Sequence, residues 1–196
     1  MSVNTVSTFL AIGAMSIGAG VAAALVLRLV AWRIATAGDL LDRVREAVSG
    51  YGLWLAWLMA VVATLGSLYY SQIAHFTPCE YCWYQRIAMY PLAVILGIAA
   101  FRGDTAVRRY IYPLAITGGV ISAYHYLIQR MPDLAAGTCS TTTPCTAALV
   151  WKFEFVSIPF MALVSFAAII TVLALDRDRT GAAIDQDVTV RPEGAT

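Results

Sequence analysis

Five apolar stretches, each close to the length needed to cross a lipid bilayer, are the feature of this 196-residue chain that most restricts its fold. They cover residues 3–27, 51–74, 83–101, 110–128 and 155–175. A helix needs about 20 mostly apolar residues to cross the hydrocarbon core. Arg86 is the one Lys, Arg, Asp or Glu residue within these stretches. The sequence therefore predicts an all-α integral membrane protein with five transmembrane helices.

The overall composition agrees with a membrane protein and excludes some function classes. The chain is 60% hydrophobic and 13% charged, whereas a soluble domain has about 25% charged residues. Its 13 Lys and Arg residues are nearly balanced by 12 Asp and Glu residues. A chain with so little net charge has no global field to attract nucleic acid or an acidic substrate, so we predict no nucleic-acid partner.

The first apolar stretch has an alternative interpretation as a cleaved signal peptide. The first eight residues contain no Lys or Arg, and the apolar run is longer than a signal peptide requires. We therefore interpret residues 3–27 as an additional N-terminal transmembrane helix. Residues 39–49 have the pattern of a short amphipathic helix at the cytosolic interface. We expect residues 1–50 to form this helix and linker, ahead of a four-helix transmembrane core at 51–175.

The basic residues indicate how the helices are oriented. If the five helices alternate in direction, ten of the 13 basic residues fall on one side. These are Arg28, Arg33, Arg43, Arg45, Arg102, Arg108, Arg109, Arg177, Arg179 and Arg191. Basic residues are enriched on the cytoplasmic side. We predict that residues 28–50 and 102–109 and a polar, disordered tail at 176–196 are cytoplasmic, and that the N-terminus is extracytoplasmic.

Four cysteines form two close pairs, Cys79 with Cys82 and Cys139 with Cys145, in connections that this topology places outside the membrane. Disulfides persist outside the cytosol, so the pattern predicts two local disulfides. Two alternatives stay open at this point: both pairs only brace their loops, or all four cysteines bind zinc. The tight ring of a CxxC disulfide favours redox chemistry.

The first pair lies at the expected start of the third helix. Pro78 is typical of a helix entry, so we expect the helix to begin near Cys79. Cys82 would then lie in the first turn, where the helix dipole favours a thiolate. Arg86 is four residues further along, on the same helix face. Its guanidinium is a candidate to stabilise that thiolate or to bind a carbonyl oxygen of an electron acceptor; the alternative is an arginine that only reaches the membrane interface.

The second pair lies in a polar, turn-rich connection at residues 129–154. A disulfide in such a loop can be presented to a soluble partner protein. His125, near the outer end of the fourth helix, is a candidate for proton transfer or acceptor binding, with simple packing as the alternative.

Several motifs resemble the disulfide bond formation protein B (DsbB) family, in particular its Gram-positive BdbC-type branch. They span roughly residues 53–175 and occur in the order of the family. The motifs are Leu65-Gly66-Ser67-Leu68-Tyr69, Pro78-Cys79-Glu80-Tyr81-Cys82-Trp83-Tyr84-Gln85-Arg86, Met89-Tyr90-Pro91-Leu92, Gly103-Asp104-Thr105, His125-Tyr126-Leu127 with Gln129, Pro144-Cys145 and Ile158-Pro159-Phe160.

The resemblance implies a four-helix bundle in a bacterial plasma membrane. Such a protein oxidises a reduced thioredoxin-fold (DsbA-like) protein outside the membrane and reduces a membrane quinone, either menaquinone or ubiquinone. It also implies that Cys139–Cys145 meets the partner, that Cys79–Cys82 passes the electrons on, and that Arg86 binds the quinone.

Two features depart from the family pattern: the extra helix and linker at residues 1–50, and a second cysteine pair closer together than in proteobacterial members. Two other functions fit parts of the pattern: a structural multispan protein whose disulfides brace loops, and a vitamin-K-epoxide-reductase-like quinone reductase. The order of CxxC and Arg86 argues against the second.

Overall fold

The computed structural model describes residues 2–135, 139 and 143–176, and the protein in this range is built from helices. The long helices are α1 (Val3–Ala31), α2 (Ala35–Val48), α3 (Gly52–Leu68), α4 (Glu80–Arg102), α5 (Arg108–Arg130) and α6 (Ile158–Leu175). Short helical turns are η1 (Tyr69–Ile73), η2 (Thr105–Val107) and η3 (Pro132–Leu134). The extended structure described is a single bridge between Lys152 and Val156.

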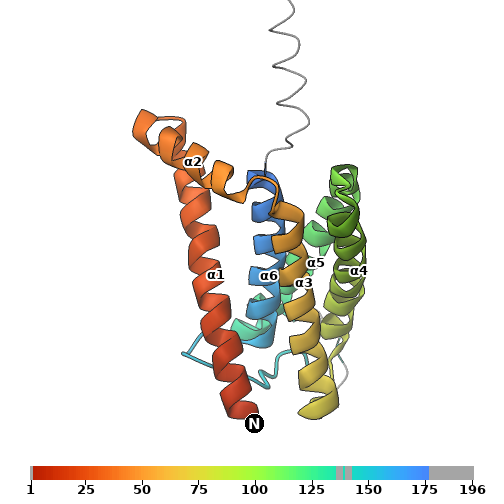
Figure 1. Ribbon diagram of the computed structural model, residues 1–196. Coiled ribbons are helices and arrows are strands. Elements are labelled where there is room, and N and C mark those ends of the chain that lie inside the picture. Colours follow the sequence, from red (N-terminus) through yellow and green to blue (C-terminus); the bar gives the residue numbers. More distant parts are fainter. Residues whose placement is uncertain (1, 136–138, 140–142, 177–196) are drawn as a thin grey trace, which may run out of the picture.

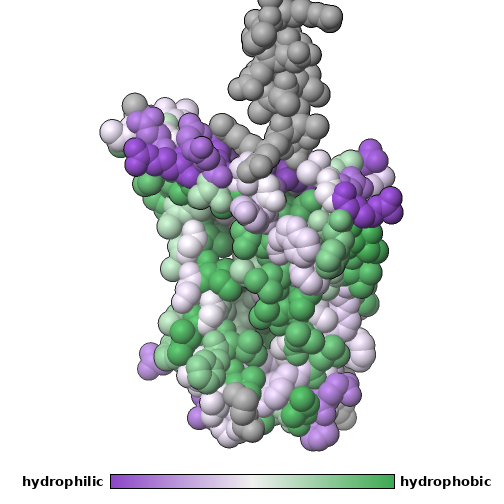
Figure 2. All heavy atoms as spheres, in the orientation of Figure 1, coloured by the Kyte–Doolittle hydropathy of each residue, from purple (hydrophilic) through white to green (hydrophobic). Residues whose placement is uncertain are grey.

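Five segments are long and apolar enough to cross a membrane, which confirms the prediction of an all-α membrane bundle with an additional N-terminal span. They are Val3–Ala31, Gly52–Ile73, Glu80–Arg102, Thr105–Arg130 and Ile158–Leu175. Helices α3 to α6 pack together as the core, while α1 packs along α6 (Figure 1). Figure 2 shows an apolar belt around the middle of the visible face, with hydrophilic residues gathered at the two ends.

Helix α2 lies across the end of the bundle opposite the N-terminus of α1 (Figure 1). It begins at Ala35, four residues before the predicted start at residue 39, and ends at Val48. Gly50 follows with φ of 83°, a left-handed conformation that glycine adopts without strain and that turns the chain into α3. The structure therefore has a helix where the sequence predicted one, and the predicted and observed C-terminal ends differ by one residue.

The last two helices pack closely because α5 has a glycine at their contact. A methyl group added at Gly118 would lie 2.3 Å from the ring of Phe166, which is fully buried in the core. A side chain there would force the helices apart. This contact fixes α5, the helix that carries His125, against α6.

The second apolar stretch is interrupted near its C-terminal end. The sequence predicted one continuous helix at 51–74, but α3 ends at Leu68 and a π-helical turn, η1, follows. In that turn the Ala74 amide donates to the Tyr69 carbonyl, five residues back. Such π turns inside helices occur frequently at functional sites.

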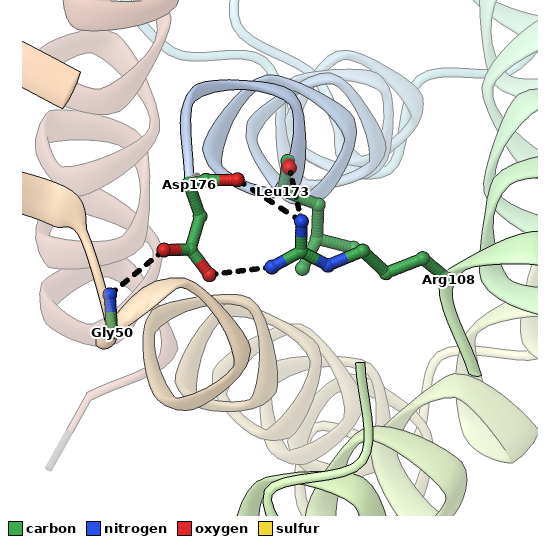
Figure 3. Close-up of polar contacts among 4 residues, drawn as sticks. All are labelled: Gly50, Arg108, Leu173 and Asp176. Atoms are coloured by element: carbon green, nitrogen blue, oxygen red, sulfur yellow. Dashed lines mark hydrogen bonds and ion pairs between the residues drawn. The ribbon is translucent and has the colours of Figure 1, made fainter. Parts of the chain in front are cut away.

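An ion pair closes the opposite end of the bundle. Arg108 Nη2 lies 2.6 Å from Asp176 Oδ2, and the Gly50 amide donates to Asp176 Oδ1 over 2.8 Å (Figure 3). The network therefore joins the start of α5, the end of α6 and the connection between α2 and α3. The sequence had placed Asp176 in a disordered tail, which is wrong for this residue because these partners hold it. The rest of the predicted tail, 177–196, lies outside the described residues.

Candidate redox site

The CxxC pair lies at the N-terminus of α4, as predicted. Cys79 is the N-cap residue, with extended backbone, and Cys82 lies in the first helical turn. Their sulfur atoms are 2.9 Å apart and not bonded, well beyond the length of about 2.05 Å of a disulfide. The structure therefore shows this pair as two thiols, not as the disulfide that the sequence predicted.

The second pair is a disulfide, as predicted. Cys139 and Cys145 are bonded, with their Cα atoms 5.9 Å apart. Cys145 is buried, at 1% exposure, whereas Cys139 is partly exposed. Because these two sulfurs are bonded to each other, they offer no thiolates for the four-cysteine zinc site considered above. A different set can hold a metal ion, since the donor atoms of Cys79, Cys82 and His125 lie within 4.8 Å of one another.

His125 lies between the two cysteine pairs. Its side chain is 1% exposed, and its Nε2 atom is 3.6 Å from Cys79 Sγ and 3.2 Å from the Cys145 carbonyl oxygen. On the other side of the ring, Gln85 Nε2 lies 3.3 Å from Nδ1. A glutamine amide nitrogen can only donate, so Nδ1 accepts and the proton of the neutral imidazole lies on Nε2. That proton faces both cysteine pairs.

These contacts change the acidity of Cys79. Its pKa is lowered well below the ordinary thiol value, mainly because the Cys82 thiol donates a hydrogen bond to it. Burial opposes the shift, and the contact with His125 adds to it. A thiolate is both the nucleophile and the leaving group in thiol–disulfide exchange. The sequence had favoured Cys82 as the thiolate. In the structure Cys79 has the histidine contact that stabilises one.

Arg86 is held by the C-terminal end of α3. Its Nε donates to Ser67 Oγ over 3.0 Å and its Nη2 to the Ser67 carbonyl over 3.1 Å. The guanidinium also lies 5.3 Å from the centre of the Trp83 ring. Arg86 and Cys82 line the same cavity, which agrees with their predicted position on one helix face.

Two cavities adjoin at Cys82. One, of about 320 Å³, has mostly apolar walls from α1, α3, α4 and α6, and includes Arg86 and Gln85. The other, of about 350 Å³, lies between the two loops and includes Cys79, His125 and Pro144. Cys82 lines both cavities, so one sulfur of the CxxC pair is accessible from the loop side and from the membrane side.

Two residues of this arrangement were not singled out from the sequence. Gln85 orients the histidine, and its position beside Arg86 in a mostly apolar helix was the available signal, since buried polar residues need partners. Ser67 anchors Arg86 from another helix, and its spacing from Arg86 contained no signal for that contact.

The fold and the site define a class of protein: a multi-pass helical membrane protein in which a disulfide and a dithiol meet at one end of the bundle, a thiol–disulfide oxidoreductase. The profile of the family "Disulfide bond formation protein DsbB" matches residues 51–175. The chain belongs to the DsbB family.

Several curated proteins share this similarity. "Disulfide bond formation protein C" of Bacillus subtilis (strain 168) is 49% identical over 124 residues, which cover 63% of this chain and 90% of that protein. "Probable disulfide formation protein C 1" of Bacillus anthracis is 47% identical over 126 residues, covering 64% and 91%. "Probable disulfide formation protein" of Coxiella burnetii (strain RSA 493 / Nine Mile phase I) is 40% identical over 141 residues, covering 68% and 96%. None of the solved structures matches the chain.

Proposed function

We propose that this protein is a protein-dithiol:quinone oxidoreductase. It reoxidises a DsbA-like thioredoxin-fold protein outside the plasma membrane and passes the electrons to menaquinone or ubiquinone, which supports disulfide formation in exported proteins. The observation that carries the proposal is the position of His125, whose Nε2 atom reaches both Cys79 Sγ and the Cys145 carbonyl. Family membership supports the same reaction.

Electrons enter at the loop disulfide. A thiolate of the reduced partner attacks Cys139 Sγ, the Cys139–Cys145 bond breaks, and Cys145 leaves as a thiolate. The partner's second thiolate then attacks its own sulfur in the mixed disulfide, releasing Cys139 and forming the partner's disulfide. The greater exposure of Cys139 supports this order of attack, because the buried Cys145 is less accessible to a soluble protein.

Electrons then pass between the pairs. The Cys145 thiolate attacks Cys79 in an oxidised Cys79–Cys82 pair, and Cys82 leaves as a thiolate. Cys139 next attacks Cys145, which restores the loop disulfide and releases Cys79 as a thiolate. The His125 Nε2 proton is placed to stabilise that leaving thiolate. The product, a bonded loop pair and a reduced CxxC pair, has the same bonding as the structure described here.

Electrons leave on the membrane side. The cavity of about 320 Å³ fits a quinone ring, since its walls are mostly apolar and the guanidinium of Arg86 offers hydrogen-bond donors for a carbonyl oxygen. A bound quinone accepts two electrons and two protons and becomes a quinol. Cys82 faces this cavity, and the Cys79–Cys82 disulfide forms again as the electrons leave. Overall, one dithiol of the partner is oxidised for each quinone reduced.

The orientation of the protein in the membrane is part of this proposal. Arginines at the α2 end of the bundle include Arg28, Arg33, Arg43, Arg45, Arg102, Arg108 and Arg109. The positive-inside rule favours this end as cytoplasmic, together with the C-terminus. Both cysteine pairs are then extracytoplasmic, where disulfides persist.

The test uses the purified full-length protein with a reduced thioredoxin-fold partner and either quinone. We expect multiple-turnover oxidation of the partner that requires quinone and is abolished by Cys82→Ser, while Cys139→Ser blocks partner oxidation yet leaves the Cys79–Cys82 pair able to be oxidised. Turnover at the wild-type rate by either variant would refute the assignment.

Thiol trapping tests the alternative of purely structural disulfides. Bracing disulfides stay oxidised when quinone is withheld, whereas the proposed reaction leaves the four cysteines reduced once partner dithiol is in excess. Disulfides that remain oxidised under those conditions would favour the structural alternative.

A further inference from the structure

Helix α1 lies outside the part of the chain that matches the family, yet it lines the same cavity as Cys82 and Arg86. Its contribution runs over two turns, from Phe9 to Ile17. We propose that α1 is part of the acceptor site: it forms the wall that confines the tail of an isoprenoid quinone. This inference rests on the proposed function and adds a binding role for the N-terminal helix.

Side-chain contacts hold the outer half of α1 at this position. The Tyr70 hydroxyl donates to Ser7 Oγ over 3.1 Å, and Ser7 is 2% exposed. Leu10 packs against Gly66, where an added methyl group would lie 3.5 Å from the Leu10 side chain. Such a buried hydroxyl pair is expensive to separate, because each partner would lose its hydrogen bond away from water. The helix is therefore fixed beside the cavity.

A further contact links α1 to the loop that carries the second cysteine pair. Lys152 Nζ donates to Asn4 Oδ1 at the outer end of α1. Lys152 follows the disulfide loop and forms the bridge to Val156 at the entry to α6. Helix α1 therefore contacts the other elements that line the cavity and also the segment that follows the disulfide loop, as expected for a helix that belongs to the site.

The polarity of the cavity indicates which end of a quinone lies against α1. Helix α4 contributes Cys82, Gln85 and the charged Arg86 to the lining. The residues from α1 are apolar or glycine, namely Phe9, Leu10, Gly13, Ala14 and Ile17. Phe9 is also 66% exposed, so the cavity is open at this residue of α1. The geometry thus favours the ring at Arg86 and the isoprenoid tail along α1 toward the lipid.

Gly13 is the position in α1 at which the cavity wall can be altered with little disturbance of neighbouring residues. It lines the cavity, and a methyl group built at its Cα would meet nothing within 4 Å. The first carbon of a larger side chain at this position therefore meets no protein atom, and the rest of that side chain takes up space beside the cavity. Gly20, about two turns along the same helix, is equally open but does not line the cavity. The substitutions Gly13→Leu and Gly20→Leu form a matched pair.

The direct test is photoaffinity labelling of the full-length protein with an azido-substituted isoprenoid quinone whose photoreactive group is on the tail. Trypsin cleavage after Arg28 releases a peptide that carries α1 up to that residue. We expect label on this peptide that unlabelled quinone competes away. Competable label confined to residues beyond Arg28 would overturn the proposal.

The matched pair provides a second readout. We expect Gly13→Leu to weaken quinone binding and raise the apparent KM for quinone at least fivefold, with Gly20→Leu within twofold of wild type. Transfer from the reduced partner to the loop disulfide in a single turnover without quinone should stay unchanged in both, which shows that they fold. If Gly13→Leu does not fold, Phe9→Ala replaces it and should weaken binding by removing wall.

The outcomes separate this inference from the proposed function. A wild-type protein that neither binds nor reduces any quinone would refute the proposed function. A wild-type protein that reduces quinone while Gly13→Leu or its replacement matches it would refute the role of α1 alone.

Discussion

The imidazole of His125 lies 3.6 Å from the sulfur of Cys79, and the same Nε2 atom lies 3.2 Å from the carbonyl oxygen of Cys145. One buried side chain on α5 therefore contacts both the N-cap residue of α4 and the backbone of a cysteine in the loop disulfide. The two cysteine pairs are far apart in sequence. Through this histidine they form one site.

The first prediction concerns the acidity of Cys79 in the reduced protein. An unperturbed thiol has a pKa of about 8.5, so below pH 8 its thiolate fraction falls about tenfold for each pH unit. The pKa of Cys79 is lowered by its contacts with Cys82 and His125, so its thiolate persists as the pH falls below 7. Alkylation of Cys79 by iodoacetamide, followed by mass spectrometry, should therefore remain rapid at pH 6.

Removing the imidazole of His125 should shift the pH profile of Cys79 alkylation to higher pH. In His125→Ala, loss of one of the contacts that lower the pKa of Cys79 should shift the alkylation profile to higher pH, with slower electron transfer between the pairs. His75→Asn is the control, because His75 lines the same cavity of about 350 Å³ as His125 but is exposed. An identical pH profile in His125→Ala and wild type would contradict the assigned contact.

The second prediction concerns the anchoring of Arg86 by Ser67. Arg86→Ala should raise the apparent KM for quinone by about tenfold or more, because a hydrogen bond to a charged group contributes about 1.5–3 kcal/mol. Ser67→Ala removes the hydroxyl that accepts from Arg86 Nε, so it should raise the same KM less and leave kcat nearly unchanged. Ser67 is thus a positioning residue.

Ser71 supplies the matched control for Ser67. It lies one turn further along, and its hydroxyl donates to the backbone carbonyls of Ser67 and Leu68. Ser71→Ala should leave the KM for quinone within twofold of wild type. Equal effects of Ser67→Ala and Ser71→Ala would indicate a general disturbance of the π turn instead of a specific anchor for Arg86.

Much of the fold could be predicted from the sequence, because a bilayer imposes a minimum length and apolarity on each span. The five spans and the start of α4 directly after Cys79 follow from that rule and from Pro78. The interruption of α3 by a π turn did not follow, since residues 69–73 contain no proline, glycine or charged residue to mark where the helix changes. The ordering of Asp176 depends on Arg108, 68 residues away in sequence, which local polarity cannot reveal.

The candidate site was predictable in its parts and not in its connections. The spacing from Cys82 to Arg86 put both on one helix face, and the structure has both in one cavity. The contact of His125 with Cys145 depends on how a turn-rich loop folds back over α5, which spacing does not determine. The roles of the four cysteines, His125 and Arg86 in the reaction stay predictions.

The third prediction concerns which sulfur of the loop disulfide the partner attacks. A partner protein with a single active-site cysteine should form a stable mixed disulfide. Its thiolate displaces Cys145, and the partner has no second thiol to release itself from the adduct. Peptide mapping should place the adduct on Cys139, which is partly exposed, and not on the buried Cys145. Cys139→Ser has no loop disulfide to attack and should give no adduct there. An adduct mapped to Cys145 would reverse the proposed order.

The fourth prediction concerns the ion pair at the opposite end of the bundle. The side chains of Arg108 and Asp176 are 14% and 5% exposed, and breaking such a buried pair by removing one partner costs about 3–5 kcal/mol. Asp176→Asn should therefore lower the apparent unfolding midpoint in detergent markedly. Electron transfer measured well below that temperature should change little, because the ion pair lies at the other end of the helices from the cysteines.

Two comparisons make this prediction specific. The pair of Asp42 and Arg45 is more exposed, at 57% and 24%, and exposed pairs contribute at most about 1 kcal/mol, so Asp42→Asn should shift the midpoint much less. Gly52→Ala should also destabilise, since the added methyl group would lie 2.3 Å from Asp176 Oδ2 and push the carboxylate from Arg108. If Asp176→Asn shifts the midpoint no more than Asp42→Asn, the network does not hold α3, α5 and α6 together.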